Sequence, residues 1–196
     1  ICDILFLYFL NIILEDIMKK DFARVLLSRE EIAEKIKEVA ARITEDYKGE
    51  SVLFVCILKG SVHFYSDLTR EIDLPLTMDF MSISSYGAGT TSSGEVKMLK
   101  DLDKTINGKH VIIVEDIIDS GNTLSYLKRL LSSRQPASIK ICTLLDKPSR
   151  RKVDLTPDYC CFTIPDEFVV GYGLDYDELY RNEKEIYVLD PAVYSE

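Results

Sequence analysis

The chain has no surplus of positive charge. Its 196 residues include 24 Lys and Arg against 33 Asp and Glu, which leaves a net charge of −9. A general nucleic-acid-binding protein needs a basic face that displaces counterions from phosphates, so this composition argues against one. Small anionic ligands are not excluded, because screening beyond about 8 Å makes local charge the deciding quantity.

Disulfide and metal-binding patterns are also missing. The five cysteines form no CxxC pair, and the two histidines, His63 and His110, lack partners at ligand spacing. An odd number of cysteines without framework spacing favours a reducing, cytoplasmic setting. Adjacent Cys160 and Cys161 could form a redox pair, but strand neighbours point to opposite faces, so we favour an interpretation as packing residues.

The long apolar stretch at the start of the chain fits neither a signal peptide nor a membrane span. Residues 1–17 contain no basic n-region and no small-residue cleavage site. They are shorter than the ~20 residues that a membrane helix requires, and Asp3 interrupts them. Because Met18 looks like a natural start, we interpret 1–17 as upstream translated sequence or a non-essential extension, and 18–196 as one domain.

Helical and strand patterns alternate along that domain. Ser28 and Glu31 form a capping box before an amphipathic helix over 29–47. Further helices are predicted over 62–71 and 121–134. Short apolar runs predict strands over 52–57, 76–83, 110–115, 138–145, 159–164, 168–170 and 186–189. This alternation predicts an α/β fold with a mostly parallel sheet flanked by helices.

Residues 84–94, SSYGAGTTSSG, form a segment that cannot bury itself. They contain no aliphatic side chain larger than Ala. Two interpretations stay open here, a plain linker and a mobile lid over an active site.

Ligands of such sheets bind beyond the carboxyl ends of the strands, where the loops 58–61, 115–123 and 146–151 are predicted. In the second loop, residues 119–123 (DSGNT) lie between a strand and a helix start. Their N–H groups can converge on a phosphate, and the helix dipole favours the same charge. Ser120 and Thr123 add hydroxyl donors, and Gly121 permits close approach of the backbone.

Glu115 and Asp116 immediately precede this predicted phosphate cup. A carboxylate accepts hydrogen bonds from hydroxyl groups, and a ribose offers two. A sugar phosphate lying across the crevice would satisfy both features. An acidic strand end before a capped helix and a receiver-type phosphorylation domain are the alternatives, but neither requires the small-residue cup.

The segment 114–123, VEDIIDSGNT, resembles the phosphoribosyl pyrophosphate signature of type I phosphoribosyltransferases. Further motifs follow in the family's order from about Met18 to the C-terminus: Leu58-Lys59-Gly60, Ser85-Tyr86-Gly87, Leu145-Asp146-Lys147-Pro148, Phe168-Val169-Val170-Gly171-Tyr172 and Leu174-Asp175-Tyr176. The resemblance is to the bacterial branch that acts on hypoxanthine and guanine. It implies a twisted, mostly parallel sheet with a small hood subdomain and a flexible lid loop.

The activity that this resemblance implies is purine salvage. The 5-phosphoribosyl group of phosphoribosyl pyrophosphate would pass to hypoxanthine or guanine, giving IMP or GMP and pyrophosphate. Mg²⁺ is the implied cofactor, a hard cation that prefers carboxylate and phosphate oxygens. The family also implies a dimer or tetramer, with no nucleic-acid or membrane partner.

The resemblance assigns a role to each matching residue. Asp119 would be the acid/base group beside purine N7. The ribose and 5-phosphate would be held by Glu115, Asp116, Ser120, Gly121, Asn122 and Thr123. Pyrophosphate would bind Lys59, Gly60 and Arg181, under a lid closed by Ser85 and Tyr86. The purine would contact Lys147, Phe168, Val169 and Asp175, and Mg²⁺ would lie on Glu115, Asp116 and Asp175. In the family, the peptide before the residue matching Lys59 can be cis.

Two competing functions remain open on the same fold. One is an RNA-binding regulator similar to the pyrimidine attenuation protein, which would need a basic surface that this acidic chain does not predict. The other is a transferase for another base, such as xanthine. Arg150 and Arg151 are interpreted as surface or interface charges, and both histidines as structural.

Overall fold

The computed structural model describes residues 21–85 and 96–195. Its elements, in chain order, are β1 (Phe22–Leu27), α2 (Arg29–Asp46), β2 (Val52–Leu58), α3 (Val62–Glu71), β3 (Leu76–Ser85), β4 (Val96–Lys100), β5 (His110–Ile118), α4 (Asn122–Ser132), β6 (Ser138–Asp146), η1 (Pro148–Arg150), β7 (Tyr159–Thr163), β8 (Val169–Val170), β9 (Ile186–Leu189) and α5 (Pro191–Tyr194). The predicted extension 1–17 lies outside the described residues.

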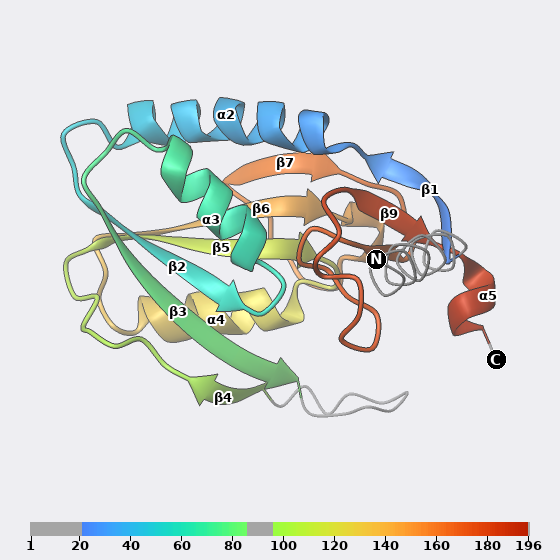
Figure 1. The fold of residues 1–196 in the computed structure, drawn as a ribbon. Helices are drawn as coiled ribbons and strands as arrows, with labels where there is room; N and C mark the ends of the chain where they lie inside the picture. The colour runs from blue at the N-terminus through green and yellow to red at the C-terminus, as the bar shows by residue number, and fades with distance from the viewer. Residues whose placement is uncertain (1–20, 86–95, 196) are drawn as a thin grey trace, which may run out of the picture.

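A six-stranded sheet in the order β4-β3-β2-β5-β6-β7 forms the centre of the molecule (Figure 1). β3, β2, β5, β6 and β7 pair in parallel, and β4 alone pairs antiparallel, with β3. Helices α2 and α3 cover one face of this sheet, and α4 covers the other. The predicted α/β class with a mostly parallel sheet is therefore confirmed.

A second, three-stranded sheet in the order β1-β9-β8 is antiparallel throughout. It brings the first described strand beside the last one and corresponds to the predicted hood. Strand β1 was not predicted, because its burial alternates poorly and its partner is near the other end of the chain. Strand β4 and the short helix α5 were not predicted either.

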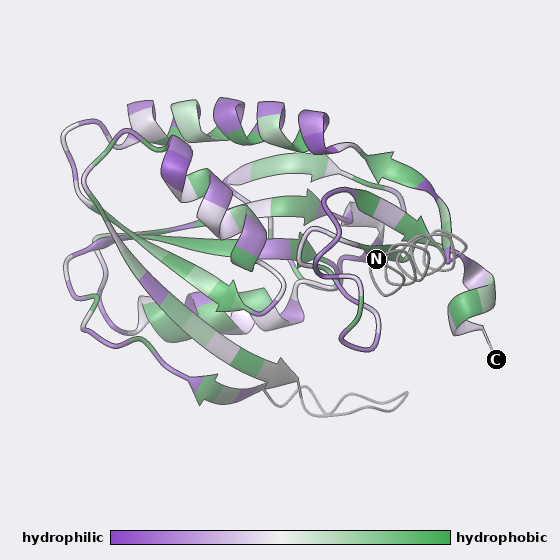
Figure 2. Cartoon of the chain, viewed as in Figure 1, coloured by the Kyte–Doolittle hydropathy of each residue, from purple (hydrophilic) through white to green (hydrophobic). Residues whose placement is uncertain are grey.

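The central strands are apolar on both sides because helices pack on both sides. On β5, Ile112 and Val114 are buried in the layer under α2 and α3. Their neighbours Val111 and Ile113 are buried in the layer under α4. Figure 2 shows this as hydrophobic residues along the central strands, with hydrophilic residues on the outward faces of the helices. The sequence of this strand is a continuous apolar run because helices cover both faces of the sheet.

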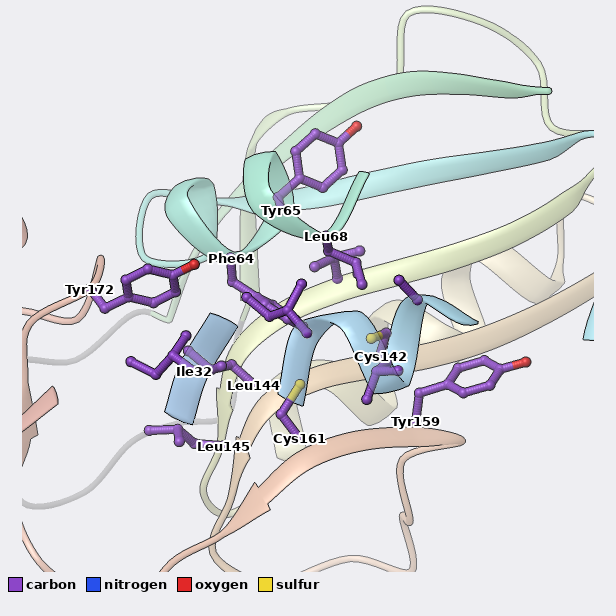
Figure 3. Close-up of a cluster of buried hydrophobic side chains, with 14 of the residues drawn as sticks. Ile32, Phe64, Tyr65, Leu68, Cys142, Leu144, Leu145, Tyr159, Cys161 and Tyr172 are labelled. Atoms are coloured by element: carbon purple, nitrogen blue, oxygen red, sulfur yellow. The ribbon is translucent and has the colours of Figure 1, made fainter. Parts of the chain in front are cut away.

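Helix α2 places one apolar face on the sheet. Ser28 caps its start, with its hydroxyl accepting from the Glu31 N–H at 3.3 Å and its own N–H donating to the Glu31 carboxylate at 2.8 Å. Figure 3 shows the layer below, where Ile32, Phe64 and Leu144 come together from α2, α3 and β6. Full burial of such a side chain contributes roughly 1.5–3 kcal/mol. The predicted capping box and helix are confirmed.

Two predicted boundaries are wrong in a way that matters for the site. The strand predicted to end at residue 115 continues to Ile118, because Ile117 and Ile118 still pair with Leu145 and Asp146 of β6. The strand predicted over 76–83 continues to Ser85, paired with β4. The remainder of the lid candidate, residues 86–94, which includes Tyr86, lies outside the described residues. In the parts that are described, no helix is long and apolar enough to cross a membrane.

Candidate active site

Three loops meet at the carboxyl edge of the main sheet. β2, β5 and β6 are adjacent and parallel, so their ends at Leu58, Ile118 and Asp146 lie along one edge. The C-terminal segment that carries β9 lies beyond the same edge (Figure 1). The predicted convergence of the three loops is confirmed, and the hood supplies a further wall.

Glu115 and Asp116 lie within the C-terminal half of β5 rather than in a loop. Burial and the neighbouring Asp116 raise the pKa of Glu115 well above its usual value. Burial also raises the pKa of Asp116, although hydrogen bonds with Glu115 and with the Ile117 N–H, and the nearby Arg181, offset part of this effect. Two partly buried carboxyl groups that interact with each other therefore lie near the end of β5.

Two glycines let three chain segments approach Asp116. A Cβ added to Gly60 would lie 1.6 Å from the Asp116 Oδ2 atom. A Cβ added to Gly173, where φ is +103°, would lie 1.9 Å from the Gly60 carbonyl oxygen. The peptide bond between Leu58 and Lys59 is cis, as the family resemblance implied. A side chain at position 173 would push these backbone segments apart, and one at position 60 would displace the Asp116 carboxylate.

A cluster of charges lies next to these glycines. Arg181 donates from Nη1 to the Gly173 carbonyl oxygen at 2.8 Å and pairs through Nη2 with Asp175 at 2.8 Å. Glu178 lies 2.9 Å from the Lys59 ammonium and 3.5 Å from Arg181 Nη2. The sequence prediction included Lys59, Asp175 and Arg181 but missed Glu178, which its position three residues before Arg181 could have suggested.

The predicted phosphate cup is a small cavity at the start of α4. Its volume is about 170 Å³, and its lining consists of Glu115, Ile117, Ile118, Asp119, Ser120, Gly121, Thr123 and Leu124. Gly121 adopts a left-handed conformation with φ +78°, and α4 begins directly after it, so that the first N–H groups of the helix have no partner within the helix. Ser120 Oγ accepts from the Asn122 N–H at 3.4 Å. The cavity therefore has the size and donors for a phosphate group.

The segment 150–152 packs along the outside of this cup. Arg150 Nε donates to Asp119 Oδ1 at 3.2 Å, and the Lys152 N–H donates to the Ser120 carbonyl oxygen at 2.9 Å. Arg151 pairs with Asp146 and is only 13% exposed. The interpretation of Arg151 as a surface charge is therefore wrong, because its side chain is mostly buried and packs beside Gly121. Arg150, at 52% exposure, does lie at the surface.

On the other side of Asp119 lies a buried ammonium group. Lys147 is 8% exposed, and its Nζ donates to the Glu167 carbonyl oxygen at 2.6 Å. Burial lowers the pKa of Lys147, and the charge of Asp119 partly offsets this. Its backbone N–H donates to the Ile118 carbonyl oxygen at 3.0 Å, which fixes the loop to the end of β5.

Aromatic rings from the hood complete this end of the site. Phe168 is 38% exposed, stacks on Tyr194 with centroids 5.0 Å apart, and meets Tyr176 edge-on at 5.6 Å. Val169 follows in β8, opposite Val188 of β9. Phe168 therefore presents an apolar ring surface beside the residues that follow β6.

The acidic residues of the site fit a magnesium ion that also binds substrate. Among the residues that the structure describes, no group of three or more His, Cys, Asp or Glu side chains could hold a metal by itself. Both Asp175 carboxylate oxygens are engaged, one by Arg181 and one by the Glu178 N–H at 2.9 Å. Mg²⁺ commonly takes one or two carboxylates, waters and phosphate oxygens rather than an all-protein cage, so this donor set is compatible with it.

A larger hollow of about 600 Å³ lies away from this edge, between α2, α3 and residues 182–184. His63, Asp67, Arg70 and Tyr172 are among the residues that line it. It contains none of the residues predicted for the site. The volume of a hollow alone therefore does not identify the candidate site.

Comparison with known proteins agrees with this geometry. Residues 25–177 match the phosphoribosyl transferase domain. A hypoxanthine-guanine phosphoribosyltransferase of Bacillus subtilis is 55% identical over 177 residues, covering 90% of this chain and 98% of the relative. One of Streptococcus thermophilus is 51% identical over 178 residues, covering 91% and 99%. A crystal structure of a hypoxanthine phosphoribosyltransferase from Staphylococcus aureus has a TM-score of 0.89 at 52% identity, covering 92% of this chain and 98% of that one. The chain belongs to the phosphoribosyl transferase domain family, and its fold is the type I phosphoribosyltransferase fold.

Proposed function

We propose that the protein is a purine salvage enzyme. It transfers the 5-phosphoribosyl group from phosphoribosyl pyrophosphate to hypoxanthine or guanine and releases pyrophosphate with IMP or GMP. The observation that carries this proposal is the meeting of a carboxylate pair, a phosphate-sized cup and a buried ammonium group at adjacent strand ends. The activity printed in the names of the Bacillus and Streptococcus relatives supports it.

The cup and the carboxylate pair bind the sugar phosphate. The N–H groups at residues 120–123 donate to the 5-phosphate oxygens, and the dipole of α4 favours their negative charge. Glu115 and Asp116 accept from the ribose hydroxyl groups, because a carboxylate offers acceptors to both. Their pKa values are raised chiefly because burial disfavours the charged forms.

Lys59, the Gly60 backbone and Arg181 bind the pyrophosphate. Glu178 lies against both cations, so the leaving group would replace an internal anion when it binds. Mg²⁺ bound by Glu115, Asp116, Asp175 and substrate oxygens would offset charge on the departing pyrophosphate. Ser85 at the end of β3 and Tyr86 after it would close over the reacting centre and exclude water.

Lys147, Phe168, Val169 and Asp175 form the purine end. An ammonium group can only donate, so Lys147 selects a 6-oxo group over the 6-amino group of adenine. Phe168 stacks on the base, and the Val169 backbone pairs with its edge. Asp119 lines the cup, and its charge acts on Lys147, so it can manage the N7 proton while N9 attacks C1 of the ribose.

The decisive experiment is a product assay with phosphoribosyl pyrophosphate, Mg²⁺ and each purine base in turn. Hypoxanthine and guanine should yield IMP and GMP, and adenine should yield no nucleotide above background. Product from xanthine at a higher rate than from either base would favour the other-base alternative. Tight RNA binding without any nucleotide product would favour the regulator, which the net charge of −9 makes less favourable.

Replacing Lys147 by alanine should weaken purine binding selectively. We expect the KM for hypoxanthine to rise about 10-fold or more, which corresponds to ~1.4 kcal/mol. The KM for phosphoribosyl pyrophosphate should change by less than about threefold, because the cup and carboxylates remain. Initial rates under varied concentrations of each substrate measure both constants.

Lys140→Ala is the matched control for this change. Lys140 lies on β6, the strand that Lys147 follows, and pairs with Asp158 at 2.7 Å. Its loss should leave both KM values within about twofold, as for a surface ion pair. Equal increases in the two KM values of the Lys147 variant would remove Lys147 from the purine site.

The setting of the enzyme follows from less specific features. Four described cysteines, Cys56, Cys142, Cys160 and Cys161, are free thiols, which supports a reducing cytoplasmic compartment. We further propose a homodimer or homotetramer with no nucleic-acid or membrane partner. Light scattering of the purified protein measures the number of subunits.

A further inference from the structure

The phosphate cup lacks the positive charge that its ligand requires. Its lining includes the carboxyl groups of Glu115 and Asp119 but, over the described residues, no Lys or Arg. A phosphate monoester carries about −1.5 to −2 charges at neutral pH. The start of helix α4 offsets only about half a charge. A cation that lies just outside the lining would correct this imbalance.

Arg151 is placed directly behind the lining. The ideal Cβ position of Gly121 is 3.0 Å from Arg151 Cδ and 3.1 Å from its Nη1. With only 13% of its side chain exposed, the charge of Arg151 is screened less than that of a surface residue. The neighbouring Arg150 is a weaker candidate, because it is half exposed and its guanidinium is already bound to Asp119.

The ion pair of Arg151 is oriented with its positive end toward the cup. Nη2 pairs with Asp146, whereas Nη1, on the Gly121 side, is buried and has no acceptor among the described residues. A buried N–H without an acceptor is unfavourable for folding. The presence of this unpaired N–H group in Arg151 is explained if the positive charge of the guanidinium stabilises a ligand on the other side of Gly121.

Neighbouring contacts keep this arrangement rigid. Arg150 and Lys152, on either side of Arg151, bind Asp119 and the Ser120 backbone respectively. Three consecutive residues therefore hold three consecutive residues of the cup. Gly121 is required between them both for its positive φ and for its close approach to the Arg151 stem.

We infer that Arg151 is a positioning residue for the 5-phosphate, which acts through the Gly121 backbone and supplies positive potential without entering the cup. The inference rests on the proposed function, since it specifies which part of the ligand depends on this residue. The two members of this ion pair therefore have opposite effects, because the Asp146 carboxylate lowers the positive potential that Arg151 supplies to the cup.

Calorimetric titration with IMP and with inosine tests this role, because the two ligands differ only in the phosphate. Arg151→Met should weaken IMP binding by about 10-fold or more and inosine binding by less than about threefold. Asp146→Asn should leave IMP binding unchanged or tighter, because the opposing charge is removed. Arg134→Met, which breaks the remote pair of Arg134 with Asp101, is the control and should affect neither ligand.

The double variant Arg151→Met with Asp146→Asn guards against a folding defect, because it leaves no buried charge unpaired. It should fold and still bind IMP about 10-fold or more weakly. Recovery of wild-type IMP affinity in the double variant, or parallel losses for IMP and inosine, would overturn the inference while leaving the proposed function intact. A wild-type protein that binds neither IMP nor inosine would overturn both.

Discussion

Asp119→Asn is expected to slow turnover by about 10²-fold or more, because an amide cannot exchange the N7 proton as a carboxylate does. Binding of the sugar phosphate should remain, since the hydrogen-bond donors of the cup are backbone N–H groups and hydroxyls that this change leaves in place. The Arg150 guanidinium, which donates to Asp119 Oδ1 at 3.2 Å, can also donate to an amide oxygen. Single-turnover rates together with calorimetric binding of IMP separate the two quantities.

Asp166→Asn is the matched control. Asp166 faces the same Arg150 guanidinium at 3.6 Å and undergoes the same chemical change, but it does not line the cup. Its turnover should stay within about twofold of wild type. An Asp119→Asn enzyme with unchanged single-turnover rates would mean that another group handles the proton.

Gly60→Ala is expected to be the second large effect, and here the loss should come from displaced geometry. A Cβ would lie 1.6 Å from Asp116 Oδ2, so the carboxylate has to rotate away. Its other oxygen accepts from the Ile117 N–H at 2.8 Å, a bond that this rotation would break. Misplacement by about 1 Å costs on the order of 10²-fold in catalysis, so kcat/KM for phosphoribosyl pyrophosphate should fall by at least that factor.

The fold should tolerate the same substitution, because the atom in the way is the end of a side chain and Gly60 does not require a positive φ. Gly108→Ala gives the reverse pattern as a control. Gly108 has φ +70° with open space around it, so alanine should lower stability by about 1 kcal/mol and leave activity unchanged. Thermal unfolding and steady-state kinetics on both variants measure the contrast. A Gly60→Ala enzyme with wild-type kcat/KM would show that Asp116 does not contact the sugar.

Much of the site could be predicted because its chemistry is local. The phosphate cup consists of consecutive residues between one strand and one helix, so its donors are ordered by the chain itself. The burial of β5 on both faces could likewise be predicted, because its residues form a continuous apolar run in the sequence. The exact end of that strand was not, because its last two pairs depend on Leu145 and Asp146 of another strand. The strand propensity of residues 110–118 alone could not predict these two pairs.

Residues 18–196, taken alone as a sequence, determined the α/β class, the three loops at one edge and the segment that lines the cup. The tertiary structure decided the hood pairing of β1 with β9, the contact of Glu178 with Lys59 and Arg181, and the burial of Arg151 behind Gly121. The physical reason is the same in each case. Periodicity and turn chemistry act over neighbouring residues, whereas the burial and pairing of a charge depend on segments that only folding brings together.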